Sequence, residues 1–377
     1  MSVDAMSLGV GSGTAFSGAI MLIRSIIIAL SAIGIVNTAD AGQRTFVASH
    51  GLDTNSCTLS APCRSFGTAI AQTATGGEVI VLDSAGYGPV TIGKSISLIA
   101  PAGVYAGVTV SSGDGIVINA AGSTVILRGL SINGLGGAID VHAMQVASLH
   151  IENCVISGAT SHGVLNEAPG SVLSVLDTVV RGNGGAGISV AANSAVVIDR
   201  TRVEKNGADG FFLATSTGEA TATLTNSVFA YNGANGIAVN SNANAKVYVQ
   251  VEGTSISSNG AHGFVAVTSA MTSDAQVSFA RNAVNGNGGD GITLSGATGA
   301  ILATLTVQLA DNVMHANKGG GYRSVGHVSA RASNNVVSGN GSYAFICDGA
   351  NILRSYNNNV ADSFFAAGGC HFTVAYF

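Results

Sequence analysis

The sequence lacks tryptophan, contains only 4 prolines in 377 residues, and carries charge at just 9% of its positions. With a hydrophobic share of 47%, so little charge excludes a disordered chain, and the scarcity of proline excludes a collagen-like one. The net charge is −5 and no cluster of Lys and Arg occurs, so the electrostatic signature of a nucleic-acid-binding protein is missing. Ser, Thr, Asn and Gly must then form most of the surface, which is typical of a secreted β-rich protein.

The sequence also lacks the spacings that bind metals or organic cofactors. No Cys-x-x-Cys pair and no His/Cys cluster occurs, so we expect neither a metal nor a cofactor. Among the five cysteines, Cys57 and Cys63 border a short loop that a disulfide could close. Cys347 and Cys370 lie 23 residues apart, one repeat length, and form a second predicted pair. Cys154 is left over and is expected to be a small buried side chain.

The segment 21–41 has the three parts of a secretory signal. Arg24 supplies the charged start, 25–36 the apolar stretch, and Ala39-Asp40-Ala41 the small residues at the cleavage positions. The alternative is a membrane anchor, but the apolar stretch is short and Arg24 interrupts it. We therefore expect export to the periplasm, the cell envelope or the medium, with no membrane span after cleavage. We expect residues 1–20 to be an upstream extension or disordered, with Met21 as an alternative start.

The main positive feature is a repeat of 23 to 30 residues: an apolar strand, a polar gap, Asn-Gly, two variable residues, Gly, and another apolar strand. A fixed period of this length indicates a solenoid. Each repeat contains about three short alternating segments bounded by Gly and Asn, which predicts three strands per coil. The predicted fold is all-β, a single-domain right-handed parallel β-helix of about ten to twelve coils over 42–377.

One asparagine recurs at the same position in the repeats. Stacked inside a bend, its amide can bond to the coils on both sides, so we expect a structural ladder. Ala159 interrupts the series. The predicted members are Asn133, Asn183, Asn206, Asn232, Asn259, Asn287, Asn317 and Asn340.

A solenoid needs covered ends, because its terminal coils expose core and strand edges. The segment 64–75 is predicted to be a short amphipathic helix with Phe66, Ala69 and Ile70 on one face, inside an N-terminal cap over 42–80. The aromatic-rich segment 360–377 is the predicted C-terminal cap. Three longer insertions follow the strand after the second Gly and should widen one lateral loop.

The start of the mature chain resembles that of bacterial right-handed parallel β-helix repeat proteins of the pectin-lyase-like superfamily. The resemblance consists of a strand, a Gly-x-Asp-x-Asn loop at Gly51, Asp53 and Asn55, then Pro62 and a helix near Ala69. With the Asn-Gly-x-x-Gly repeats it covers about residues 45–360. It implies the fold firmly and a reaction poorly, since members include lyases, hydrolases, epimerases, tailspikes and adhesins.

No catalytic signature of that superfamily is legible, because the acidic residues are scattered singly. The residue before the second Gly gives one hypothesis, since stacking would align His162, Asp209, Asn235, His262 and Asp290 on one edge. His262, Asp290 and Asp209 are then candidate acid/base groups and Asn235 a candidate sugar contact. The alternative is that these residue types favour left-handed turns and bond to local backbone.

A second hypothesis concerns a small cationic patch. Arg181, Arg200, Arg202 and Lys205 lie in adjacent repeats and could bind a ligand, although Asp199 and Glu204 offer them surface ion pairs instead. Tyr231, beside Asn232, is the aromatic residue best placed to stack on a sugar.

From the sequence alone we expect a protein that binds an extended polymer, above all a polysaccharide, along the flat faces of a solenoid. Two alternatives stay open: a pectin-lyase-like polysaccharide lyase or glycoside hydrolase, and a structural or adhesive spacer.

Overall fold

The structure, a computed structural model, describes residues 43–270, 272–297, 304–348, 351–356, 358–362 and 371–372. The predicted leader at 21–41, the stretch 1–20 and most of the predicted C-terminal cap lie outside these residues. Cys370 lies outside them too, so its predicted pairing with Cys347 is not described. No helix in the described ranges is long and apolar enough to cross a membrane.

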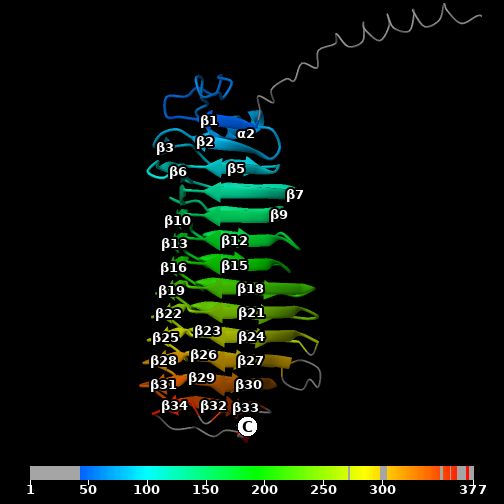
Figure 1. The fold of residues 1–377 in the computed structure, drawn as a ribbon, viewed down its shortest axis with the longest axis vertical. Coiled ribbons are helices and arrows are strands. Elements are labelled where there is room, and N and C mark those ends of the chain that lie inside the picture. Colours follow the sequence, from blue (N-terminus) through cyan, green and yellow to red (C-terminus); the bar gives the residue numbers. More distant parts are fainter. Residues whose placement is uncertain are drawn as a thin grey trace, which may run out of the picture. The chain divides into compact units, whose positions relative to one another are not determined.

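The predicted parallel β-helix is present from residue 44 onward. Its strands form a 23-stranded sheet and a 12-stranded sheet, and each strand pairs in parallel with its counterpart in the next coil. Figure 1 shows the coils of this unit stacked one below another from β1 to β33. Each coil has three faces, which we call A, B and C in chain order.

Face A carries the longest strands of the regular coils and forms one column of the larger sheet. Its strands are β1 (Arg44–Val47), β2 (Gly77–Val81), β5 (Ile96–Ile99), β12 (Val172–Leu176), β15 (Ala195–Asp199), β18 (Glu219–Thr225), β21 (Lys246–Glu252), β24 (Asp274–Ala280), β27 (Thr304–Ala310), β30 (Val328–Ser333), β33 (Ile352–Ser355) and β35 (His371–Phe372).

Face B is the 12-stranded sheet, one short strand per coil. Its strands are β3 (Ala85–Gly86), β6 (Ala106–Thr109), β8 (Leu130–Asn133), β10 (Val155–Ser157), β13 (Val179–Arg181), β16 (Arg202–Glu204), β19 (Val228–Ala230), β22 (Ser255–Ser257), β25 (Ala283–Asn285), β28 (Val313–His315), β31 (Val336–Ser338) and β34 (Val360–Ala361).

Face C is the second column of the larger sheet and follows the Asn-Gly-x-x-Gly turn. Its strands are β4 (Val90–Ile92), β11 (Val164–Asn166), β14 (Ile188–Val190), β17 (Phe211–Thr215), β20 (Ile237–Ser241), β23 (Phe264–Thr268), β26 (Ile292–Ser295), β29 (Tyr322–Val325) and β32 (Phe345–Asp348). Two long strands, β7 (Ile116–Arg128) and β9 (Val141–Glu152), run from face C into face A without a break.

The core follows from alternation along each strand. In β21, Val247, Val249 and Val251 point inward while their neighbours face solvent. Each fully buried Val, Ile, Leu or Phe contributes about 1.5–3 kcal/mol of transfer free energy, and the coils stack such residues in register. Aromatic pairs such as Phe264 and Phe279, with ring centroids 5.2 Å apart, fill the wider coils.

The asparagine ladder exists from Asn183 to Asn340. Each Nδ2 donates to the Oδ1 of the next member at 2.9–3.0 Å, and each backbone N–H donates to the same oxygen. Asn133 was wrongly included, because it pairs in register with Ser157 and Arg181 and so lies two residues before the ladder position. The ladder position of its own coil is occupied by the exposed Leu135.

Asp140 occupies the interruption of the ladder at Ala159. In later coils the second Gly of the motif faces the ladder amide, and a Cβ at Gly163 would lie 2.6 Å from Asn183 Nδ2. Asp140 stands one coil earlier in the place of Gly163, where Ala159 leaves the necessary space. Its side chain is fully buried, and neither carboxyl oxygen has a partner among the described residues.

A second ladder, which the sequence reading missed, follows the turn between faces A and B. Each member accepts a hydrogen bond from the backbone N–H of the preceding member, as in Thr201 N–H to Ser227 Oγ at 3.1 Å. It begins with hydroxyl side chains and continues with amides: Thr178, Thr201, Ser227, Thr254, Asn282, Asn312, Asn335 and Asn359.

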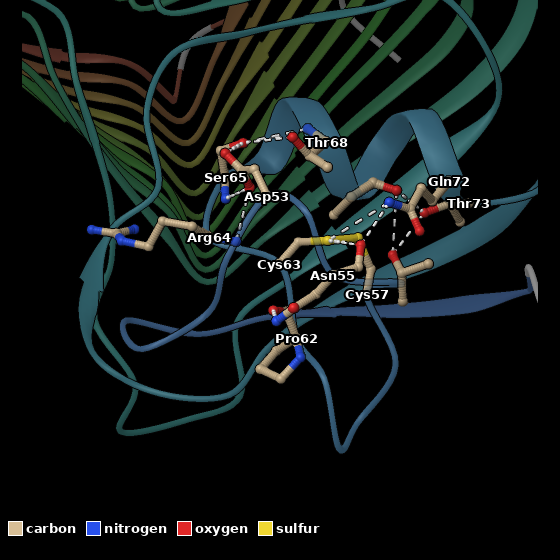
Figure 2. The surroundings of a disulfide bond; sticks show 12 residues. Asp53, Asn55, Cys57, Pro62, Cys63, Arg64, Ser65, Thr68, Gln72 and Thr73 are labelled. Carbon is tan, nitrogen blue, oxygen red and sulfur yellow. Dashed lines mark hydrogen bonds between the residues drawn. A yellow bond between two sulfur atoms is a disulfide. The ribbon is translucent and has the colours of Figure 1, made fainter.

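The N-terminal cap contains the only helix of the described residues, α2 (Phe66–Gln72), shorter than the predicted 64–75. Ser65 caps its first turn, and Phe66, Ala69 and Ile70 are buried as predicted. Figure 2 shows how Asp53 holds the preceding loop, accepting from the backbone N–H groups of Arg64 and Ser65, both at 2.9 Å. Cys57 and Cys63, the first predicted pair, are joined by a disulfide beside it.

Candidate functional site

The surface best suited to a ligand is the outer side of face A from β18 to β33. The outward residues of these strands form two stripes along the coil axis, because neighbouring strands pair in strict register. The first stripe contains Thr221, Tyr248, Gln276, Thr306 and Ser329. The second stripe contains Thr223, Gln250, Ser278, Gln308, Arg331 and Arg354.

Two adjoining hollows follow these stripes. The first, of about 390 Å³, is lined by both stripes from β18 to β27, with the inward-facing Ala222, Val249 and Val277 at its base. The second, of about 470 Å³, lies between β27 and β33 and ends at Tyr356 and Asn358. Both include Gln308, so they form one shallow channel along the coil axis, which we call the face A groove.

The face A groove is uncharged over most of its length. Threonine, serine and glutamine side chains provide most of its polar atoms, and Tyr248 provides an aromatic surface. No carboxylate of the described part of the chain lines either hollow. Among the residues that the structure describes, Arg331 is the one charged residue that lines the groove, in its second hollow. Arg354 follows it in register on the next coil, in β33. Such a surface can bind hydroxyl-rich ligands through neutral hydrogen bonds and stacking.

The predicted acid/base column lies elsewhere, at the turn between faces B and C. There the side chains accept backbone hydrogen bonds from the next coil: His162 Nδ1 from Ala186 N–H at 3.1 Å, and Asp209 Oδ1 from Asn235 N–H at 2.8 Å. Asn235 Oδ1 accepts from His262 N–H, and His262 Nδ1 from Asp290 N–H at 2.9 Å. The five residues therefore form a third series of backbone caps.

His262 and Asp290 approach each other without a direct hydrogen bond, at 3.8 Å between Nδ1 and Oδ2. The Asp290 carboxylate, nearly buried, accepts from Gly320 N–H at 2.6 Å, from the Tyr343 hydroxyl at 2.8 Å and from Thr293 Oγ1 at 3.1 Å. Burial, together with this carboxylate, raises the pKa of Tyr343. Since Nδ1 of His262 accepts a backbone N–H, the proton of the neutral ring lies on Nε2.

Two of the four residues of the predicted cationic patch, Arg200 and Arg202, form ion pairs. Arg202 Nε bonds Glu204 at 2.7 Å, and Arg200 forms a bidentate pair with Asp177 at 2.8 and 2.9 Å. Arg200 also contacts Asp199. Arg181 and Lys205 are exposed on the outer side of face B and its following turn. Tyr231 is 58% exposed in the corresponding turn of the next coil, and it does not line the face A groove.

A cluster that the sequence reading missed surrounds His142 on face C. Its Nδ1 lies 2.8 Å from Asp114 Oδ2 and its Nε2 lies 2.9 Å from Glu167 Oε2. Burial of the ring lowers the pKa of His142, but the two carboxylates outweigh it, and the net shift is upward. Both nitrogens are occupied, so the ring links three coils as an imidazolium. The partners lie 28 and 25 residues away, and no motif marks them.

No group of three or more His, Cys, Asp or Glu side chains suited to a metal ion occurs in the described part of the chain. Cys154 is a free, buried thiol, and burial raises its pKa to about 11, which disfavours a nucleophilic thiolate.

Comparison with known proteins agrees with this architecture. The family described as "Right handed beta helix region" matches residues 71–221 and 188–360. Pectate lyase Pel9A is similar in structure, with a TM-score of 0.51 and 16% identity over 78% of this chain and 80% of that one. The A-module of mannuronan C-5 epimerase AlgE6 from Azotobacter vinelandii has a TM-score of 0.55 and 17% sequence identity, over 78% of this chain and 88% of that one. The A-module of mannuronan C-5 epimerase AlgE4 from the same organism has a TM-score of 0.53 and 18% sequence identity, over 80% of this chain and 91% of that one. None of the curated proteins matches the chain by sequence.

Proposed function

The chain belongs to the right-handed β-helix family, and on that premise we propose that it binds an extended polysaccharide along the face A groove. The observation that carries this proposal is the register of the groove, which repeats hydroxyl and amide side chains on successive coils about 4.8 Å apart. A ligand that repeats along its own length can use such a surface, whereas a small molecule would occupy only a part of it.

The chemistry of the lining supports a sugar polymer. Gln250, Gln276 and Gln308 each offer a donor and an acceptor without a charge, which matches the mixed character of sugar hydroxyls. Tyr248 adds a flat apolar surface on which a sugar ring can stack. Pectate lyase and mannuronan epimerase are named for polysaccharides, and their structural likeness to this chain agrees with the proposal.

We infer that the protein acts outside the cytoplasm, in the envelope or the medium. The disulfide between Cys57 and Cys63 and the signal-like segment at 21–41 support this location.

The test is a binding screen of the full chain against soluble neutral and acidic polysaccharides, followed by measurement of Kd. Tyr248→Ala and Gln276→Ala should each weaken the best ligand, the tyrosine variant by about ten-fold, equivalent to ~1.4 kcal/mol. Tyr231→Ala is the matched control, since it removes an exposed tyrosine outside the groove. Loss of binding in that control with none in Tyr248→Ala would place the site elsewhere.

A turnover assay on the same ligands separates binding from catalysis. A lyase or hydrolase would release new chain ends, whereas a binding protein or spacer would not. If activity appears and His262→Ala or Asp290→Ala abolishes it while Tyr248→Ala does not, the turn column rather than the groove is the functional site.

A further inference from the structure

Most of the arginines that the structure describes have a partner, and three do not. Six of those that the structure describes form ion pairs with a carboxylate: Arg44, Arg128, Arg200, Arg202, Arg281 and Arg323. Arg64 instead donates to Gly86 O at 2.7 Å and lies over the ring of Tyr87. Arg181, Arg331 and Arg354 have no such partner among the described residues, and only Arg331 and Arg354 are neighbours on adjacent coils.

These two arginines face the same side of adjacent coils. β30 and β33 pair in parallel with Arg331 opposite Arg354, while Ala330 and Leu353 on the same strands point into the core. Their Cα atoms are therefore about one strand spacing, ~4.8 Å, apart. Like charges directly opposite each other in a sheet destabilise it.

The surrounding chain supplies little negative charge to offset this repulsion. From residue 291 to the end, the acidic side chains are Asp311, Asp348 and Asp362, against Lys318, Arg323, Arg331 and Arg354. That gives four positive against three negative charges, in a protein whose net charge is −5. Asp348 already pairs with Arg323 at 3.2 Å, and Asp362 accepts from Gly339 N–H at 2.9 Å.

We propose that Arg331 and Arg354 form a subsite for an anionic group carried by the polysaccharide, a carboxylate or a sulfate, at the end of the face A groove. This proposal rests on the proposed function. Two parallel guanidinium groups can each donate two hydrogen bonds to such an oxyanion, and the anion removes their mutual repulsion. Gln308, in register before Arg331, together with Tyr356 and Asn358, offers neutral contacts to the same sugar unit.

The experiment compares ligands that differ only in charge. Kd is measured for a polyuronate and its methyl ester, and for a sulfated and an unsulfated glucan, with the wild type and with Arg331→Gln and Arg354→Gln. We expect one charged form to bind at least about ten-fold more tightly than its neutral counterpart. Each variant should lose most of that difference while its affinity for the neutral form is unchanged. Arg181→Gln is the matched control, because Arg181 is another exposed arginine, lies on face B and forms no ion pair among the described residues.

The outcomes separate this inference from the proposed function. Equal binding of charged and neutral forms, or equal loss of both in Arg331→Gln, overturns the anion subsite but leaves polysaccharide binding intact. An equal effect of Arg181→Gln overturns it as well, since the attraction would then be general. Failure of every polysaccharide to bind overturns both. Which charged polymer responds decides between carboxylate and sulfate.

Discussion

The coils around β9 and the coils from β13 onward place a polar side chain inside the bend between faces B and C in two different ways. In the later coils a glycine faces an asparagine of the following turn, and the amide fills the bend with hydrogen bonds on both sides. In the earlier coil, Asp140 stands in the place of this glycine and Ala159 stands in the place of the asparagine. The polar side chain therefore comes from the glycine position instead of the asparagine position. The bend therefore requires one short polar side chain in its interior, and either position can provide it.

The two solutions differ in their chemistry. An asparagine amide both donates and accepts, so it satisfies a neighbour above and a neighbour below without any charge. A carboxyl group in the same place must keep its proton to avoid a buried charge, and burial raises the pKa of Asp140 to about 8. The nearby Ala159 N–H lowers this pKa only in part, and it already donates to Asn183 Oδ1 at 3.0 Å. The stability of the bend should therefore depend on pH in the coil of Asp140, whereas the asparagine ladder of the regular coils has no titratable group.

Removing a member of the ladder should have the largest effect. Asn232→Ala deprives Asn206 of its acceptor for both Nδ2 and the backbone N–H, and leaves Asn259 Oδ1 without one donor. Several buried polar groups lose partners at once, so we expect about 3–5 kcal/mol of destabilisation in urea unfolding. Asn133→Ala, outside the ladder, should cost less than about 1 kcal/mol. Equal losses in the two variants would refute the assignment of the ladder.

A smaller effect is expected on the pH dependence of stability, which Asp140 should cause in the earlier coil. The folded-state pKa of Asp140, about 8, lies above the ordinary value of 3.8, so the folded chain binds this proton more tightly. Its contribution to stability is complete below pH ~4 and is lost as the pH rises toward 8. Asp140→Asn should match the wild type near pH 4.5 and exceed it by about 2–4 kcal/mol at pH 8.

Thermal or urea unfolding at the two pH values measures this difference. His142, held between Asp114 and Glu167, also has a raised pKa and loses its contribution as the pH rises, but it is present in both proteins and cancels. As a control, Asn183→Asp places a carboxyl group in the regular ladder and should introduce the same pH dependence there. A wild type whose stability is level from pH 4.5 to 8 would contradict the buried carboxyl.

Much of this fold could be predicted because its signals repeat. The Asn-Gly-x-x-Gly motif recurs at one position of the coils from Asn183 to Asn287, and the asparagine alone continues at Asn317 and Asn340. Ser65 and the apolar face of 66–70 mark the capping helix. The second ladder is marked by an equally regular pattern, which the sequence analysis did not use. A Thr, Ser or Asn stands five residues before each asparagine of the first ladder, as with Thr201 and Asn206 or Asn282 and Asn287. Asn133 was misassigned because Asn-Gly occurs two residues before the ladder position in that coil.

The candidate site was harder to predict, for two physical reasons. Insertions of different length separate faces C and A, so the register that joins Thr221, Tyr248 and Gln276 cannot be counted from the asparagine. The turn column was correctly expected to align, but its hydrogen bonds depend on ring and carboxylate orientation, which the spacing does not determine. The cluster at His142 lies in the least regular coils, where no repeat relates its three members.

The smallest predicted effect tests whether Asp140 and Ala159 depend on each other in the way that Gly163 and Asn183 do. If Asp140 and Ala159 are one unit, Ala159→Asn alone should overfill the bend, because the new amide meets the Asp140 side chain, and Asp140→Gly alone should leave a cavity. The double variant restores the pair found at Gly163 and Asn183. In a double-mutant cycle at pH 6 we expect it to be more stable than the sum of the single changes by about 1–3 kcal/mol. Additive effects would mean that the two positions are independent, and that the early coils depart from the later ones for a reason other than the shared bend.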